Sequence, residues 1–387
     1  MRPARTSLMA RVGRTLSSLW LSVGIVAVAL VAVEADVNHA WKSFRHFLNP
    51  AVGKPDMHVA AEAYAGQDWV KAYWDEYVAN VHTDWSPYVM WRLRPFSGQF
   101  LTIAADGTRA TWAPPPAAKP VEIWMFGGSG LFGMGARDDH TIPSELARLL
   151  APGLPAHITN FGTPGWSIAQ EAIALAEELK AGRRPDAAIF YDGVNDAFAT
   201  ASLGRAGLPS NNANRVREFN LTAPERRGAL LGEAAMAMLP RLTKMARRAA
   251  GASDKPSLPP LPEDAPKATA DYMGATAEQI RTLAKATGFQ VRFVLQPVLF
   301  SKSAKTPFET KAAEAEAGLA EPFAQIYQRI RSHPAFAGRD DFLDLGGLFD
   351  PAAEGVFIDF NHIAEPGNLA VAQAIQAAFA AGLAGGK

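Results

Sequence analysis

A single serine stands at a glycine-rich corner behind a candidate strand, and serine is a residue type that can act as a nucleophile. The stretch VEIWMF is followed by GGSG, which places Ser129 between Gly128 and Gly130. Glycines leave room for a tight turn around such a side chain. Near neutral pH a serine hydroxyl needs a base to remove its proton. If Ser129 reacts, another part of the chain must supply that base.

The same glycines also match a phosphate-binding loop. The stretch GSGLFG (128–133) fits the dinucleotide fingerprint G-x-G-x-x-G. That fold also places a carboxylate at the end of its second strand. Here the second candidate strand, HITNF, has Asn160 near its end and no acidic residue. A Walker loop would need a lysine, and this stretch has none. The hydrolase motif G-x-S-x-G does not match either, because Leu131 stands where its second glycine is required. The glycines therefore favour a tight turn around Ser129.

A candidate base and its carboxylate partner lie near the C-terminus, in FIDFNH. Asp359 and His362 are separated by two residues, so a turn can bring the carboxylate to one ring nitrogen while the other faces a serine. A carboxylate in this place holds the imidazole in one tautomer. Taken alone the pattern is weak, because Asp359 could instead cap a turn and His362 could begin the last helix.

Two further stretches offer donors for negative charge on a carbonyl oxygen. In NFGTPGWS, Gly165 precedes a helix that a capping box at Ser167 predicts, and N–H groups at such a helix start favour anions. In YDGVND, Gly193 permits a sharp turn and Asn195 can direct its amide into a site. Taken separately, both stretches are also ordinary turn sequences.

The elements that must position these residues alternate between strand and helix patterns from residue 121 onward. The candidate strands are short, apolar runs: 121–126, 157–161, 187–192, 291–296 and 341–345. Such runs are typical of buried parallel strands, and the alternation predicts an α/β sandwich with a parallel sheet. Carboxyl ends of parallel strands share one sheet edge, where ligands bind. Ser129, Gly165, Asn195, Asp359 and His362 are therefore expected to converge there.

Composition excludes several classes of chemistry. The chain of 387 residues contains no cysteine, which rules out disulfides, thiolate metal sites, iron–sulfur clusters and a cysteine nucleophile. The eight histidines form no HExxH-type pair, so we expect neither a metal nor another cofactor. Formal charge balances at 38 basic and 38 acidic side chains, which argues against nucleic acid as a partner.

The N-terminus carries the pattern of a membrane anchor. Four arginines precede the nearly apolar segment 16–33, and acidic residues follow it. This arrangement predicts a transmembrane helix with a cytoplasmic basic tail (1–36), in the inner membrane of a bacterium, and a periplasmic body. The alternative is a signal peptide cleaved near Val33–Ala35, which gives a secreted or periplasmic protein. A buried core helix is disfavoured by the terminal position and basic flank.

Residues 37–120 are expected to form an accessory region and linker before the main domain of residues 121–387. Four aromatic residues at helical spacing, Trp69, Tyr73, Trp74 and Tyr77, favour a packing face over a sugar-stacking platform. Two alternating runs around Asp106–Gly107 predict a hairpin, and the proline-rich stretch 113–120 predicts a linker.

An insertion at about 200–270 interrupts the alternation of the main domain. We interpret it as a cap or flap beside the active site, and a membrane-surface helix is the alternative.

Together the motifs resemble the SGNH hydrolases, the GDSL esterase/lipase superfamily, over residues 121 to about 383. GGSG, NFGTPG, GVND and DFNH resemble its first, second, third and fifth blocks. The first block departs from Gly-Asp-Ser, because Gly128 precedes the serine. The resemblance implies a flavodoxin-like three-layer α/β/α sandwich. The wider pattern is similar to membrane-anchored bacterial members.

The resemblance also implies roles for the residues. Ser129 is the expected nucleophile, with His362 and Asp359 completing the triad, and Ser129, Gly165 and Asn195 contribute the oxyanion hole. The expected reaction is hydrolysis of ester-linked acyl groups, chiefly acetyl, on envelope or extracellular glycans or lipids. An O-acyltransferase that modifies exported polysaccharide and works with envelope polysaccharide machinery shares the same acyl-enzyme. A non-catalytic envelope scaffold on this fold is the third hypothesis.

Overall fold

The computed structural model describes residues 20–33 and 35, 57–114, 120–212 and 260–384, with isolated positions at 215, 216, 219, 239, 245 and 249. The chain divides into two compact units. One comprises Met1–Lys54 with Asn214–Ser257, and the other comprises Pro55–Ala213 with Leu258–Lys387. The predicted linker at 113–120 and insertion at about 200–270 fall largely outside the described residues.

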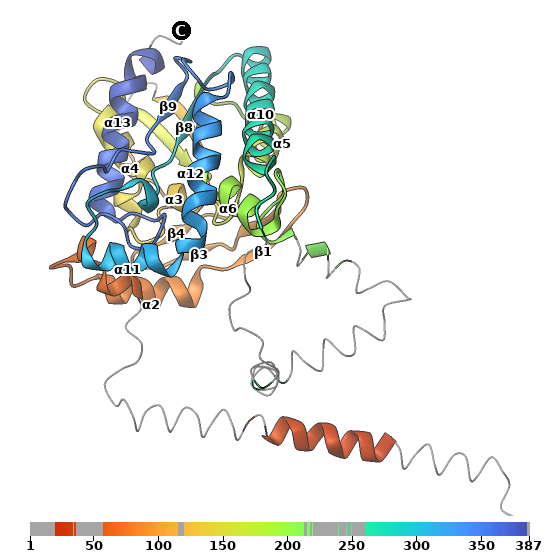
Figure 1. The fold of residues 1–387 in the computed structure, drawn as a ribbon. Coiled ribbons are helices and arrows are strands. Elements are labelled where there is room, and N and C mark those ends of the chain that lie inside the picture. The colour runs from red at the N-terminus through yellow and green to blue at the C-terminus, as the bar shows by residue number, and fades with distance from the viewer. Residues whose placement is uncertain are drawn as a thin grey trace, which may run out of the picture. The chain divides into compact units, whose positions relative to one another are not determined.

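The apolar segment near the N-terminus is helical from residue 20 to residue 33, and it appears as the red helix in Figure 1. Residues 16–19 of the predicted anchor lie outside the described part of the chain. Among the described residues no helix has the length and apolar character needed to cross a membrane. The expected transmembrane helix is therefore not found there.

A five-stranded parallel sheet forms the centre of the larger unit. Its strands are β5 (Val121–Gly127), β6 (Ala156–Asn160), β7 (Ala187–Asp192), β8 (Gln290–Leu295) and β9 (Phe342–Asp344). They lie in the order β6-β5-β7-β8-β9, which is the flavodoxin-like order. The predicted strands are confirmed within two residues at each end. The strand β6 lies on one side of β5 and β7 lies on the other, so the strand order reverses at β5. A crevice for ligands is expected beyond the carboxyl ends of the strands at such a point.

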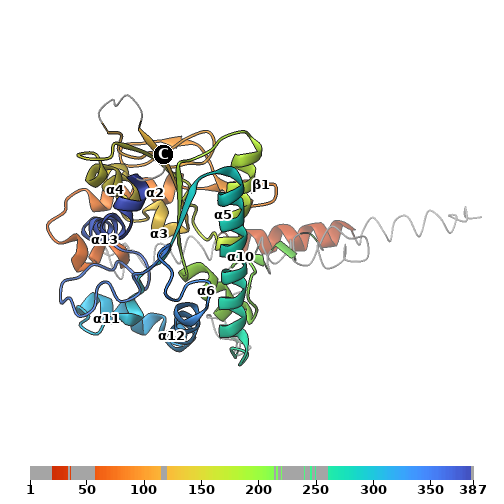
Figure 2. The same ribbon diagram turned by 90° about the horizontal axis from the view of Figure 1, so that it is seen from above.

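Helices cover both faces of this sheet, as Figure 2 shows. On one face, α4 (Ile142–Leu150) and α13 (Glu365–Ala384) bury apolar side chains such as Leu146 and Ile375. The other face is covered by α5 (Ile168–Lys180), α6 (Val194–Leu203), α10 (Ala265–Thr287) and α12 (Ala317–Ser332). Two apolar cores thus sandwich the sheet, and the predicted α/β/α layers are confirmed.

Local capping explains where these helices begin. The hydroxyl of Thr141 accepts a hydrogen bond from the Ser144 N–H at the start of α4, and a capping box links Ser167 with Gln170 at the start of α5. The sequence analysis did not identify α11 (Pro307–Ala315), although Thr306 and Glu309 form a capping box there. These caps satisfy N–H groups that have no partner inside the helix.

The accessory region is built from short elements. They are η1 (Met57–Ala60), η2 (Glu62–Tyr64), α2 (Val70–Asn80), β1 (Thr83–Ser86), β2 (Met90–Leu93), β3 (Phe96–Ser97) and β4 (Thr102–Ile103). The aromatic side chains of α2 are a packing face, because Tyr73 and Trp74 are buried against Phe132 and Ile358 of the main domain. The region therefore shares a core with the segments that follow Ser129 and precede Asp359.

The predicted hairpin at Asp106–Gly107 is present as a tight turn. Gly107 has a positive φ of 86°, and Ala104 donates to the Thr108 carbonyl across the turn at 2.8 Å. Beyond the turn the two runs pair through a bridge between Ile103 and Arg109 and a hydrogen bond from the Ala110 N–H to the Thr102 carbonyl at 2.9 Å. The strand β4 takes β3 as its partner instead, and the β1–β2 hairpin was not predicted.

Candidate active site

Ser129 lies at the sharp corner between β5 and α3 (Ser129–Phe132). A Cβ on Gly127 would approach the Leu131 Cβ at 2.7 Å and the Tyr191 carbonyl at 2.8 Å, so the corner accepts only glycine there. Gly133, with a φ of 87°, ends α3 after a single turn. The sequence thus folds so that the hydroxyl of Ser129 sits at the carboxyl end of a central strand.

Ser129, His362 and Asp359 form a connected hydrogen-bond chain. The His362 Nε2 atom lies 2.6 Å from the Ser129 Oγ, and the His362 Nδ1 atom lies 2.6 Å from the Asp359 Oδ2. A carboxylate accepts the Nδ1 hydrogen, which leaves Nε2 as the acceptor for the serine hydroxyl. The side chains are largely buried, with Ser129 8% exposed and His362 9% exposed. The predicted nucleophile, base and carboxylate are therefore brought together.

The carboxylate of Asp359 is held in its charged form. Burial raises its pKa, but the electrostatic interaction with the His362 ring and the hydrogen bonds from His362 and Asn361 lower it by more, so the pKa lies below its ordinary value. Its Oδ1 accepts the backbone N–H of Asn361 at 2.9 Å and of His362 at 2.7 Å. Asp359 thus caps a tight turn and also pairs with the imidazole.

A buried ion pair supports the loop that carries Asp359. Lys302 Nζ lies 2.7 Å from Glu309 Oε2, with both side chains 1% exposed. The other oxygen of Glu309 accepts the backbone N–H groups of Val356 at 3.0 Å and Phe357 at 3.2 Å. The loop closes by a bridge between Phe357 and Ile363. The carboxylate of Glu309 therefore holds the backbone of Val356 and Phe357, which leads into the Asp359 turn.

One proposed oxyanion donor, the Asn195 amide, lies beside the residue that precedes Ser129. Asn195 lies in the first turn of α6, after Gly193 with its φ of 115°, and donates through Nδ2 to the Trp166 carbonyl at 2.6 Å. An amide NH₂ carries two hydrogens, so one remains for another acceptor. A Cβ on Gly128 would overlap this amide. The amide nitrogen is therefore adjacent to the residue that precedes Ser129.

Gly165 occupies the left-handed region with a φ of 82°. This conformation suits glycine and turns the chain into the capped start of α5. A Cβ there would lie 3.4 Å from Trp91 Cζ2, and the Trp91 indole donates to the Pro164 carbonyl at 3.0 Å. The loop that carries Gly165 is thus held by the β2 strand of the accessory region.

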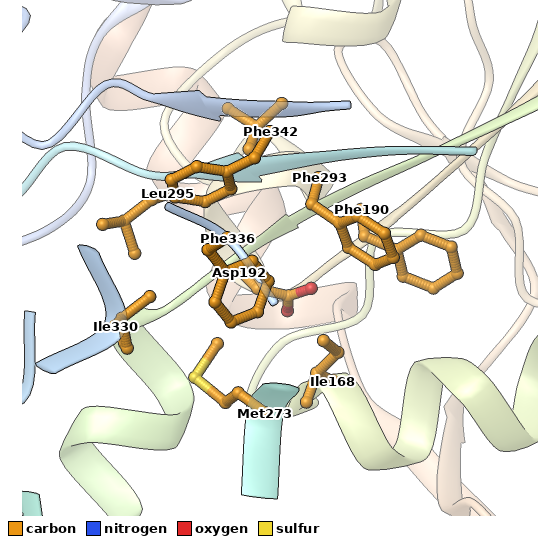
Figure 3. Close-up of a pocket in the computed structure, with 10 residues that line it drawn as sticks. Ile168, Phe190, Asp192, Met273, Phe293, Leu295, Ile330, Phe336 and Phe342 are labelled. Carbon is orange, nitrogen blue, oxygen red and sulfur yellow. The ribbon is translucent and has the colours of Figure 1, made fainter. Parts of the chain in front are cut away.

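Three buried carboxyl groups were not singled out in the sequence. They are Glu171 of α5, Asp192 at the end of β7, and Asp196 of α6. Burial, reinforced for Glu171 and Asp192 by neighbouring carboxylates, raises the pKa of all three, that of Asp196 to about 7. Figure 3 shows Asp192 facing a cavity of about 10 Å³ lined otherwise by apolar side chains such as Met273. Asp196 also accepts the Ile168 N–H at 3.4 Å.

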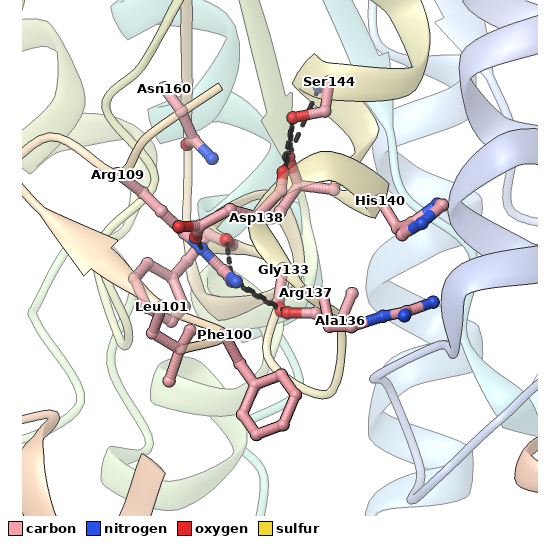
Figure 4. Close-up of polar contacts among 12 residues, drawn as sticks. Phe100, Leu101, Arg109, Gly133, Ala136, Arg137, Asp138, His140, Ser144 and Asn160 are labelled. Carbon is pink, nitrogen blue, oxygen red and sulfur yellow. Dashed lines mark hydrogen bonds and ion pairs between the residues drawn. The ribbon is translucent and has the colours of Figure 1, made fainter. Parts of the chain in front are cut away.

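The segment after the nucleophile is held by Arg109 of the accessory region (Figure 4). Its guanidinium donates to the carbonyls of Phe132 and Gly133 at 2.8 Å and of Ala136 at 2.6 Å, and it pairs with Asp138 at 2.9 Å. This side chain is fully buried. One cation thereby satisfies the carbonyls that α3 leaves without partners. The sequence analysis missed Arg109, because nothing in its local sequence identifies these partners.

Residues 125–309 match the GDSL-like Lipase/Acylhydrolase family. The matched range contains Ser129, Gly165 and Asn195 and stops before Asp359 and His362. This part of the chain is therefore similar to GDSL-like lipases and acylhydrolases. The match begins in β5 and ends in α11, so it includes the strands that hold the serine and amide.

Solved structures similar to this chain include AlAXEase, an acetyl xylan esterase (13% identity, 67% of this chain, 100% of that chain, TM-score 0.38). A lipolytic protein of the G-D-S-L family from Veillonella parvula is 14% identical and covers 67% of this chain and 98% of its own, with a TM-score of 0.37. Axe2, an acetylxylan esterase from Geobacillus stearothermophilus, is 12% identical, with 67% and 93% coverage and a TM-score of 0.35. No curated protein matches the chain.

Proposed function

We propose that this protein is a serine esterase that hydrolyses ester-linked acyl groups through an acyl-enzyme on Ser129. The observation that carries the proposal is the continuous hydrogen-bond chain from Ser129 Oγ through His362 to Asp359. A serine joined to a base, which a carboxylate orients, is the arrangement that activates a hydroxyl for attack on a carbonyl. The match to ester-hydrolysing enzymes over residues 125–309 supports the same reaction.

In this proposal the protons move along the hydrogen-bond chain from Ser129 to His362. His362 Nε2 takes the proton of the Ser129 hydroxyl as Oγ attacks the ester carbonyl, and Asp359 stabilises the imidazolium that forms. His362 then gives this proton to the oxygen of the leaving alcohol. In the second step His362 takes a proton from a water molecule as the water attacks the acyl-enzyme. His362 then returns this proton to Ser129 Oγ, and the acid product leaves.

Negative charge on the carbonyl oxygen requires donors that are already in place. In this proposal they are the backbone N–H groups of Ser129 and Gly165 and the second hydrogen of the Asn195 amide. The bond from Asn195 to the Trp166 carbonyl supports this assignment, because it ties the amide to the loop of Gly165. Removal of one such donor typically lowers turnover by about 10²–10³.

The proposed substrates are acetylated glycans or lipids of the envelope or the extracellular space. The basic and apolar N-terminal pattern supports this location, whether residues 16–33 anchor the chain in the inner membrane or form a cleaved signal. The catalytic body is then periplasmic or secreted, and envelope polysaccharide machinery is its proposed partner. Fractionation of a producing bacterium, with an antibody to the catalytic body, tests this placement.

The deciding experiment is mass spectrometry of protein treated with a fluorophosphonate probe. We expect the probe on Ser129 in the wild type and no labelling of Ser129→Ala, together with acetate release from p-nitrophenyl acetate by the wild type alone. Labelling of Ser129→Ala equal to that of the wild type would exclude Ser129 as nucleophile. Acyl release that depends on a glycan acceptor would assign an O-acyltransferase, and absence of both labelling and hydrolysis would support a scaffold.

A further inference from the structure

A second histidine, contributed by the accessory region, lies beside Asp359. His58 belongs to the short helix η1, some 300 residues before the Asp359 turn. Its Nδ1 atom is 3.0 Å from the Ile358 carbonyl oxygen and 4.0 Å from Asp359 Oδ2. The same Oδ2 atom accepts from His362. Asp359 Oδ2 therefore lies within 4.0 Å of a nitrogen atom from each of two imidazole rings.

The hydrogen-bond partner determines which nitrogen of His58 carries a hydrogen. A backbone carbonyl can only accept, so the Nδ1 atom must donate to Ile358. This N–H group then lies close to the negatively charged oxygen of Asp359 as well. The backbone N–H of Ile358 is already bonded to the His362 carbonyl at 2.9 Å. His58 thus binds the carbonyl group of Ile358, while the N–H group of Ile358 closes the Asp359 turn.

The ring of His58 is itself held in place by packing. It stacks on Trp74 with ring centroids 4.6 Å apart and an angle of 18° between the planes. Trp74 is buried in the same cluster as Ile358. The side chain of His58 is only 20% exposed. A ring fixed in this way can hold its N–H in one direction, which an exposed side chain could not do without loss of entropy.

We infer that His58 is a positioning residue for the Asp359 carboxylate in the ester hydrolysis proposed above. It does not touch the acyl group, and it acts by holding the Ile358–Asp359 backbone and facing Oδ2 with an N–H. With that hold, the carboxylate stays aligned with His362 Nδ1 during proton transfer. The accessory region is in this way part of the catalytic unit.

Two substitutions separate the hydrogen bond from the packing. His58→Phe keeps an aromatic ring on Trp74 and removes the N–H, whereas His58→Asn places an amide N–H near the Nδ1 position and removes the stacked ring. For His58→Phe we expect kcat on p-nitrophenyl acetate to fall about three- to tenfold with KM unchanged, as for loss of one hydrogen bond felt in the transition state. His58→Asn should keep kcat within about twofold while its Tm falls.

A purely structural role predicts the reverse pattern, with His58→Phe active and His58→Asn impaired, and that result would overturn the inference. His82→Phe is the matched control, since His82 is exposed in the same region and its ring contacts the nearby Ala79 carbonyl. It should leave kcat unchanged. If His58→Phe is insoluble, His58→Leu also lacks the donor and should show the same loss of kcat.

Failure of this inference differs from failure of the proposed function. If Ser129→Ala abolishes hydrolysis and probe labelling while His58→Phe and His58→Leu retain full kcat, the triad stands and the role of His58 is wrong. If Ser129→Ala remains active, the proposed function itself is wrong, whatever the result at His58.

Discussion

The side-chain amide of Asn195 fills the space that a Cβ atom on Gly128 would occupy. Gly128→Ala must therefore displace either the amide or the Ser129 corner, and we expect kcat for p-nitrophenyl acetate to fall by about 10²–10³, as for loss of an oxyanion donor. Gly153→Ala is the matched control, because a Cβ at Gly153 meets nothing within 4 Å. Steady-state kinetics check both variants. Full activity of Gly128→Ala would contradict the role of Asn195.

Asp359→Asn tests whether the carboxylate orients the imidazole. An amide in this place can donate to Nδ1, which shifts the ring hydrogen to Nε2 and removes the acceptor for the Ser129 hydroxyl. We expect kcat to fall by about 10³–10⁴ with little change in fold. The measurement is kcat together with circular dichroism, and the rate of probe labelling should fall in parallel. A variant that loses less than about tenfold would show that Asp359 is dispensable.

Lys302→Met tests the ion pair that anchors the Asp359 loop. It leaves the carboxylate of Glu309 buried without its cation, and breaking such a pair typically destabilises a protein by about 3–5 kcal/mol. We expect a Tm lower by about 10 °C in thermal melts, and a lower kcat because Glu309 holds Val356 and Phe357. Lys267→Met is the control, since its pair with Asp271 is exposed. Equal Tm values for the two variants would contradict this account.

Glu171→Gln tests the buried carboxyl cluster. The pKa of Glu171 is raised by burial and by Asp192, so its folded pKa exceeds the unfolded value of about 4.3. Stability from the neutral acid is complete below that unfolded value and is lost as pH rises through the folded pKa. An amide cannot ionise, so we expect Glu171→Gln to gain about 3–5 °C in Tm over the wild type at pH 8 and little at pH 5. Melts across pH 5–9 check this. A constant difference would contradict it.

Much of the fold follows from local patterns. The strands from β5 to β9 are short apolar runs, and α5 begins after Ser167, where the capping box predicts it. These features depend on neighbours within a few residues, which is why the sequence reveals them. The β1–β2 hairpin, α11 and α12 were not predicted. The two strands of the hairpin have only four residues each, and Pro322 interrupts the helical pattern of α12.

The supporting residues of the site could not be predicted in the same way. Arg109 bonds carbonyls between 23 and 27 residues away, and His58 meets a carbonyl 300 residues away. Neither has a local pattern, because a backbone carbonyl is the same acceptor in every residue. The buried carboxyls Glu171, Asp192 and Asp196 likewise look like ordinary helix and turn residues until the chain folds.

The sequence by itself determined the types and order of the reacting groups: a serine at a glycine corner, an amide after a third strand, and a carboxylate three residues before a histidine. Only the tertiary structure decided that these groups meet, with 2.6 Å between Ser129 Oγ and His362 Nε2. It also decided that the accessory region borders Asp359. The physical reason is that side-chain chemistry belongs to each residue, whereas distances between remote residues arise from the packing of the sheet and its two helical layers.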